Sequence, residues 1–147
     1  MTRPVEVLMI EDSPTDAMFA REAFAQGKII NNLVILEDGT DVMAYLGKQG
    51  SFAGVPTPDL IFLDLNLPGK HGHEILKEIK ADTNFKHIPV VILTTSDDEA
   101  DVLAAYQQSA ACFITKPVDL KKFISVAQDI EKFWFAVVTL PTDGAHE

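Results

Sequence analysis

The chain has 147 residues, of which 47% are hydrophobic, and a formal net charge of -10 at pH 7. This length supports one buried core and is too short for two ordinary domains. The negative charge argues against nucleic acid or an acidic membrane as a partner, because both would repel the protein. We therefore expect one domain over residues 1–147, in which 131–147 form a C-terminal extension.

The cellular compartment is predicted from what the sequence lacks. The first residues contain no long apolar stretch of the kind found in signal peptides, and no run approaches the ~20 apolar residues that a membrane helix needs. The one cysteine, Cys112, has no second cysteine in the chain with which to form a disulfide. These features favour a cytoplasmic protein without membrane contact.

Five short apolar runs alternate with stretches that have helical spacing. The runs cover residues 5–10, 33–36, 60–63, 90–93 and 112–115. They are apolar without alternation, which indicates strands buried on both faces. Ser13 followed by Pro14 is typical of a helix start after the first run. The order predicts a doubly wound α/β fold, with a five-stranded parallel sheet and helices on both faces.

Polar residues stand where four of the predicted strands end. Glu11 and Asp12 follow the first strand, Asp64 ends the third, Thr94 the fourth, and Lys116 the fifth. The carboxyl ends of parallel strands lie at one edge of the sheet, so we expect these side chains to converge. Three carboxylates would repel one another unless a divalent cation such as Mg²⁺ compensates for their charge. A phosphoryl group bridged by the ion would fit beside the lysine and the hydroxyl.

These residues resemble the receiver domains of bacterial response regulators over about residues 5–130. The matching motifs are Glu11-Asp12, Asp64 within Leu-Asp-Leu-Asn-Leu-Pro-Gly, Thr94, and Lys116 within Lys-Pro. The resemblance implies a flavodoxin-like (βα)5 receiver fold. It also implies a phosphoacceptor signalling protein rather than a conventional enzyme: Asp64 would take a phosphoryl group from a histidine kinase and later lose it to water.

The resemblance also assigns roles around Asp64. Mg²⁺ would be held by Glu11, Asp12, Asp64 and the backbone carbonyl of Asn66. Lys116 would pair with the phosphoryl oxygens, the hydroxyl of Thr94 would bond to them, and Phe113 would be the aromatic switch. Asn66 and Ser96 would tune the lifetime of the acyl phosphate.

The chain departs from the family pattern at two of its positions. Phe113 lacks the hydroxyl of the tyrosine common there, so only a change of packing can signal through it. His71 stands before Gly72, where the family often has Asp or Asn, which leaves the shape of that loop open. We interpret His71 and His73 as loop and helix-start residues rather than metal ligands, because the neighbouring sequence supplies no further nitrogen or sulfur ligands.

The C-terminal part of the sequence bears on the output of the domain and on its dimerisation. About thirty residues follow Pro117, and a fifth helix needs most of them, so we expect no DNA-binding output domain. The second half of 130–140 is apolar on every face, which favours burial against a second copy. This tail is similar to that of single-domain regulators of bacterial phytochrome kinases, which form homodimers through the fifth helix and tail. A tail folded back on its own domain is the competing interpretation.

Three other functions fit parts of the sequence. A small Mg²⁺-dependent phosphohydrolase could use Asp64 as its nucleophile, but Asn66 stands where such enzymes place a second aspartate. A flavodoxin-like cofactor binder shares the architecture, yet Glu11 and Asp12 in the first turn would repel a phosphate. A receiver that works without phosphorylation is disfavoured by the intact set of Asp64, Thr94 and Lys116.

Overall fold

The computed structural model describes residues 4–27, 30–65, 67, 70–94, 112–115, 121, 124–125 and 128–129, with 94 and 112–115 described by their backbone. Within these residues, five parallel strands form one sheet in the order β2-β1-β3-β4-β5. The predicted five-stranded parallel sheet is therefore confirmed. The strands are β1 (Val5–Ile10), β2 (Asn31–Leu36), β3 (Leu60–Asp64), β4 (Val90–Thr94) and β5 (Cys112–Thr115).

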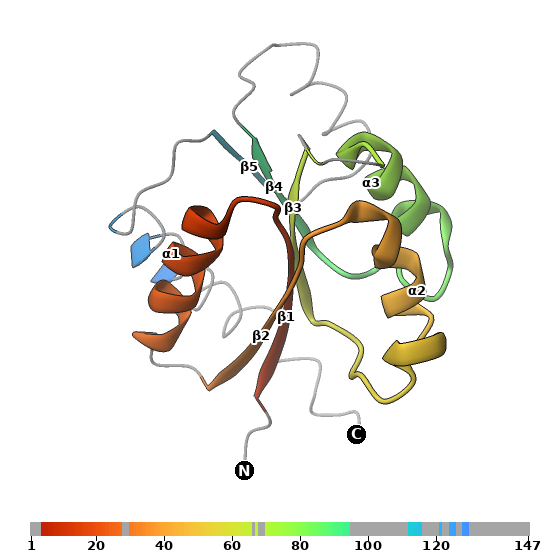
Figure 1. The fold of residues 1–147 in the computed structure, drawn as a ribbon, viewed down its shortest axis with the longest axis horizontal. Coiled ribbons are helices and arrows are strands. Elements are labelled where there is room, and N and C mark those ends of the chain that lie inside the picture. The colour runs from red at the N-terminus through yellow and green to blue at the C-terminus, as the bar shows by residue number, and fades with distance from the viewer. Residues whose placement is uncertain are drawn as a thin grey trace.

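Helices cover both faces of this sheet, as the alternation of elements predicted. Helix α1 (Pro14–Ala25) lies on one face, and α2 (Val42–Leu46) and α3 (Gly72–Ala81) lie on the other (Figure 1). Single 3-10 turns, η1 (Gly39–Asp41) and η2 (Gly50–Phe52), flank α2. The helix predicted after β4 lies outside the described residues. None of the helices in the described segments is long and apolar enough to cross a membrane.

The strand register brings the carboxyl ends of β1, β3 and β4 to one edge. Ile10 pairs with Leu36 of β2 and with Leu63 of β3, and Asp64 pairs with Leu93 of β4. The ladder continues one step beyond the strands, because the Leu65 N–H donates to the carbonyl of Leu93 at 3.1 Å. Residues that follow these strands are thus placed side by side, as expected for a doubly wound sheet.

One strand differs from its prediction. The sequence predicted that 33–36 would be buried on both faces, and these residues do pack alternately on the two sides of the sheet. They are only partly buried, however, and β2 begins earlier, at Asn31. The reason is its position at the edge of the sheet, where only β1 pairs with it. An apolar run therefore identified the strand but not its place in the sheet.

Two hydrophobic clusters fill the space between the sheet and its helices, and the sheet separates them. Alternate residues of a strand point to opposite faces. Leu8 and Ile10 of β1 accordingly pack toward α2 and α3, whereas Val7 and Met9 pack toward α1. Helix α3 presents an apolar face to this side of the sheet, since its buried residues include Ile75, Leu76 and Ile79.

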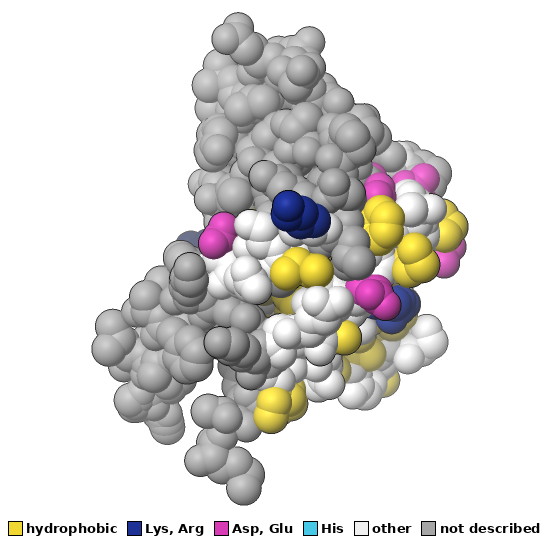
Figure 2. Space-filling model, turned by 90° about the vertical axis from the view of Figure 1, so that its left-hand side faces the viewer, with side chains coloured by type: hydrophobic (Ala, Val, Ile, Leu, Met, Phe, Trp, Pro, Cys, Tyr) yellow, Lys and Arg dark blue, Asp and Glu magenta, His cyan; other side chains and the backbone are white. Residues whose placement is uncertain are grey.

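The α1 side has Phe62 at its centre. Its side chain is 1% exposed and meets the ring of Phe24 edge to face, with ring centroids 5.7 Å apart. Ile124, from the region of the predicted fifth helix, packs against the same cluster. Viewed from the side on which α1 lies, the described part of the surface shows hydrophobic side chains at several places (Figure 2). On this side, the buried hydrophobic side chains lie between α1 and the sheet.

Replacing Phe62 tests how much this cluster stabilises the fold. We expect Phe62→Ala to lower the free energy of unfolding by about 3–5 kcal/mol, because it removes a buried ring and leaves a cavity. Urea denaturation followed by circular dichroism measures the change. Met18→Ala on the outer face of α1, where Met18 is 52% exposed, is the control and should cost little. Equal losses in the two variants would contradict the assignment of Phe62 to the core.

Candidate functional site

Three carboxylates meet at the carboxyl edge of the sheet, as the sequence predicted. Glu11, Asp12 and Asp64 each offer an oxygen, and these oxygens all lie within 4.8 Å of one another. Glu11 and Asp64 are only 1% and 3% exposed, whereas Asp12 faces solvent. Two buried like charges at that separation would repel by about 3 kcal/mol in a medium of effective dielectric constant 20. A cation placed among the three oxygens would remove this repulsion.

Backbone hydrogen bonds hold Glu11 at this edge. Its N–H donates to the carbonyl of Leu36 at 2.9 Å, which extends the β1–β2 ladder by one residue. Its carboxylate accepts from the N–H of Ser13 at 3.1 Å. Ser13 in turn caps α1, where its hydroxyl oxygen accepts from the N–H of Asp16 at 3.3 Å. The turn that carries Glu11 and Asp12 is thus fixed both to the sheet and to α1.

The other predicted site residues are described incompletely. Thr94 ends β4 and pairs with Thr115, so its backbone reaches the same edge. Its side chain lies outside the described residues, as does that of Phe113 in β5. Asn66, Ser96 and Lys116 also lie outside them. Their predicted roles therefore remain predictions.

The start of α3 packs directly on the backbone of Asp64. The Gly72 N–H donates to the carbonyl of Leu65 at 3.2 Å. A Cβ atom at Gly72 would lie 2.5 Å from the Leu65 Cα and 2.7 Å from the Asp64 carbonyl oxygen, so only glycine fits without a shift. This contact was not predicted. A glycine at the first position of a predicted helix was the available signal, because glycine is a poor helix former unless close packing requires it.

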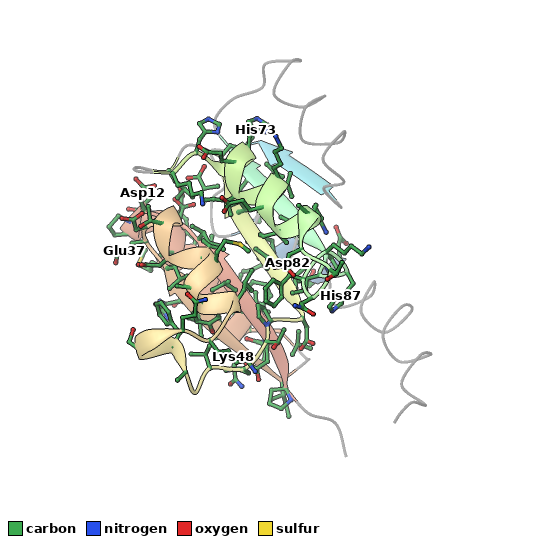
Figure 3. All side chains as sticks on the ribbon, turned by 90° about the vertical axis from the view of Figure 1, so that its right-hand side faces the viewer. Asp12, Glu37, Lys48, His73, Asp82 and His87 are labelled. Atoms are coloured by element: carbon green, nitrogen blue, oxygen red, sulfur yellow. The ribbon has the colours of Figure 1, made fainter. Side chains whose placement is uncertain are left out.

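His71 and His73 are helix-start residues, as interpreted from the sequence. His71 is the N-cap of α3, where its Nδ1 accepts from the N–H of His73 at 3.2 Å. The two rings stack with centroids 5.2 Å apart and an interplanar angle of 10°. His73 lies toward the same end of the molecule as Asp12 and Glu37, whereas His87 lies toward the far end of α3 (Figure 3). The metal-ligand cluster of the described residues includes neither His71 nor His73.

The segment after β2 adds negative charge to this edge. Glu37 directly follows Leu36, whose carbonyl accepts from the N–H of Glu11. It lies near Asp12 (Figure 3). Asp38 caps η1 and accepts from both the N–H and the hydroxyl of Thr40 at 2.9 Å. These bonds hold the pKa of Asp38 below its ordinary value. The edge therefore favours a positively charged ligand.

Comparison with known proteins assigns the chain to a family. Residues 7–128 match the family described as the response regulator receiver domain. The chain belongs to this family. The match favours a receiver over the phosphohydrolase and cofactor-binding alternatives.

Relatives of this receiver domain include photoreceptor-associated regulators. The response regulator Rcp1 of Synechocystis sp. is 46% identical over 138 residues, which span 94% of each chain. The phosphorylated cyanobacterial phytochrome response regulator RcpA is 40% identical, with a TM-score of 0.84 over 91% of this chain and 96% of its own. The Mn²⁺-bound form of Rcp1 is 45% identical, also with a TM-score of 0.84, over 95% of this chain and 100% of its own. These similarities confirm the receiver fold and the likeness to phytochrome response regulators.

Adding one methyl group at Gly72 tests the contact with Asp64. We expect Gly72→Ala to slow phosphorylation of the receiver domain about tenfold, because the new Cβ must push Asp64 and Leu65 from their positions. Intact-mass spectrometry over time with a small acyl-phosphate donor measures the rate. Gly54→Ala is a matched control, since a Cβ at Gly54 meets nothing within 4 Å. Equal rates for the two variants would show that the contact is unimportant for the site.

Proposed function

We propose that this receiver domain accepts a phosphoryl group on Asp64 from a histidine kinase. The observation that carries the proposal is the buried Asp64 within 4.8 Å of the carboxylates of Glu11 and Asp12, at the carboxyl edge of a receiver fold. A carboxylate oxygen of Asp64 attacks phosphorus, the phosphorus–nitrogen bond of the donor phosphohistidine breaks, and an acyl phosphate forms. Attack by water later releases inorganic phosphate and restores Asp64.

The donor set of the site fits Mg²⁺. Glu11, Asp12 and Asp64 supply the hard oxygen ligands that this ion prefers, and the exposed side of Asp12 leaves room for the waters that it retains. The ion would neutralise charge on the transferring group. The Mn²⁺-bound form of the similar Rcp1 supports a divalent ion here. The backbone carbonyl of Asn66 would complete the protein ligands.

The remaining roles follow the family pattern at matching positions. Lys116 would pair with the phosphoryl oxygens and the Thr94 hydroxyl would bond to them after transfer. Phe113 would then repack, which changes the surface without a hydroxyl signal. Asn66 and Ser96 would set how quickly water removes the phosphoryl group. The domain would thus catalyse both its phosphorylation and its dephosphorylation.

The partner that we propose is a phytochrome-type histidine kinase in the cytoplasm. Similarity to RcpA, a cyanobacterial phytochrome response regulator, and to Rcp1 supports this choice. Output would pass through protein contacts, because a chain with a net charge of -10 is repelled by nucleic acid. Residues 1–147 would act as one receiver domain with 131–147 as its extension.

Phosphorylation is tested by intact-mass spectrometry after incubation with Mg²⁺ and acetyl phosphate. We expect one phosphoryl adduct on the native chain and none on Asp64→Asn, which keeps the shape of the side chain but removes its nucleophilic oxygen. Chelation of the metal with EDTA should also abolish the adduct. Asp59→Asn, a change of the same kind at the other end of β3, is the matched control and should be phosphorylated.

Two outcomes would contradict the proposal. An adduct that persists in Asp64→Asn would place the phosphoryl group elsewhere. Steady release of phosphate at every turnover, without an adduct, would indicate the phosphohydrolase instead.

A homodimer through the fifth helix and tail is the second part of the proposal. The apolar second half of 130–140 supports it. We expect light scattering to give twice the chain mass for the native protein and the single mass for a Phe135→Glu, Val138→Glu variant. A native protein that stays monomeric as its concentration rises would show that the tail does not pair two copies.

A further inference from the structure

The hydrogen bond that begins α3 depends on the protonation state of one side chain. His71 Nδ1 accepts from the N–H of His73, and a ring nitrogen can accept only while it carries no proton. Histidine is the side chain type whose ordinary pKa, about 6.5, lies between pH 5 and 8. An N-cap of aspartate, asparagine or serine would not titrate in that range. The start of α3 is therefore capped by a group that mild acid can convert from acceptor to donor.

Protonation of His71 would oppose the cap in three ways. Its new Nδ1–H would face the N–H of His73, so that two donors would meet. The positive charge would lie at the N-terminal end of α3, where the helix dipole is also positive. The same charge would stand beside the stacked ring of His73, 5.2 Å away between centroids. All three effects favour release of the His71 side chain from its capping position.

Other charged groups lie on the segments that pack around this turn. On its own segment these are Lys70, which is ion-paired with Glu78, together with His73 and Glu74. The neighbouring η1 contributes Asp38 and Asp41, and β3 contributes Asp64. The helix α2, which also packs on α3, offers only the phenol of Tyr45. The described residues around His71 thus carry both signs of charge, and Lys70 is paired with Glu78.

The cap is linked to the phosphoacceptor through Gly72. This residue lies between the two histidines, and its backbone touches Leu65 and the carbonyl oxygen of Asp64 so closely that no Cβ fits. Gly39 of η1 closes the same turn from the other side, since a Cβ there would lie 2.9 Å from the carbonyl oxygen of Lys70. No side chain lies between the start of α3 and the backbone of Asp64. A shift of the helix start would therefore move this backbone directly.

We propose that neutral His71 is a positioning residue for Asp64, so that protonation of its ring loosens the start of α3 and slows phosphorylation. The proposal rests on the phosphoacceptor role argued above. It makes the receiver domain sensitive to mild acid through a group that touches neither the phosphoryl group nor the metal. Signalling would be strongest when the imidazole is neutral.

The test compares rates of adduct formation from acetyl phosphate between pH 5.5 and 8, at saturating Mg²⁺, in the full-length chain. The key variant is His71→Asn, which preserves an acceptor at the cap but does not titrate. Dividing the native rate by the His71→Asn rate at each pH removes the pH dependence of the donor and the metal. His87→Asn, at the far end of α3, is the matched control for loss of a histidine.

We expect the native rate, relative to His71→Asn, to fall about threefold from pH 7.5 to pH 5.5, as the ring of His71 changes from acceptor to donor. His71→Ala should be slow at every pH, and His87→Asn should keep the native profile. His73→Gln should also keep the native pH profile, because the backbone N–H of residue 73 that donates to His71 is retained. A native-to-His71→Asn ratio that does not change with pH would overturn the proposal.

A second measurement keeps this proposal separate from the phosphoacceptor role. Hydrogen exchange of the backbone amides in 71–75 is followed in the unphosphorylated chain and corrected for intrinsic rates. We expect protection of these amides to fall in acid for the native chain and not for His71→Asn. If no variant forms an adduct, the phosphoacceptor role fails, and unchanged protection between the two chains would overturn the His71 cap on its own.

Discussion

Two buried carboxylates, Glu11 and Asp64, set the constraint around which this domain is arranged. Their oxygens lie within 4.8 Å of each other, where ionised groups repel strongly. The sheet holds both at its edge through ladder hydrogen bonds of Glu11 and Leu65, and the N–H of Ser13 donates to Glu11. Carboxylates held this firmly need little rearrangement when a cation binds among them.

The strands and the acidic cluster were predictable because they depend on local pattern and on one general rule. Apolar runs identified the strands, and parallel pairing placed Glu11, Asp12 and Asp64 together. The start of β2 was not predicted, since it depends on distant partners. The side-chain N–H of Asn31 donates to the carbonyl of Phe24, and that of Asn32 donates to Glu6. These bonds extend the strand beyond its apolar run.

The packing at the start of α3 could not be predicted for a similar reason. Gly72 is required by the backbone of Asp64 and Leu65, which lies several residues away along the chain. The cap formed by His71 depends on a rotamer and a hydrogen-bond partner that no spacing rule specifies. Sequence reasoning thus placed the three carboxylates together but did not find the contacts that hold their neighbours in place, because those contacts arise only when separate elements meet.

The division of the interior by the sheet has a consequence for how such domains diversify. Leu8 and Ile10 belong to one cluster, and Val7 and Met9 belong to the other, so the two sides share strands but few side chains. Substitutions on opposite sides should combine almost additively. Evolution could therefore remodel the α1 side while the α2–α3 side keeps its packing. A lineage could in this way change one layer of helices without repacking the other.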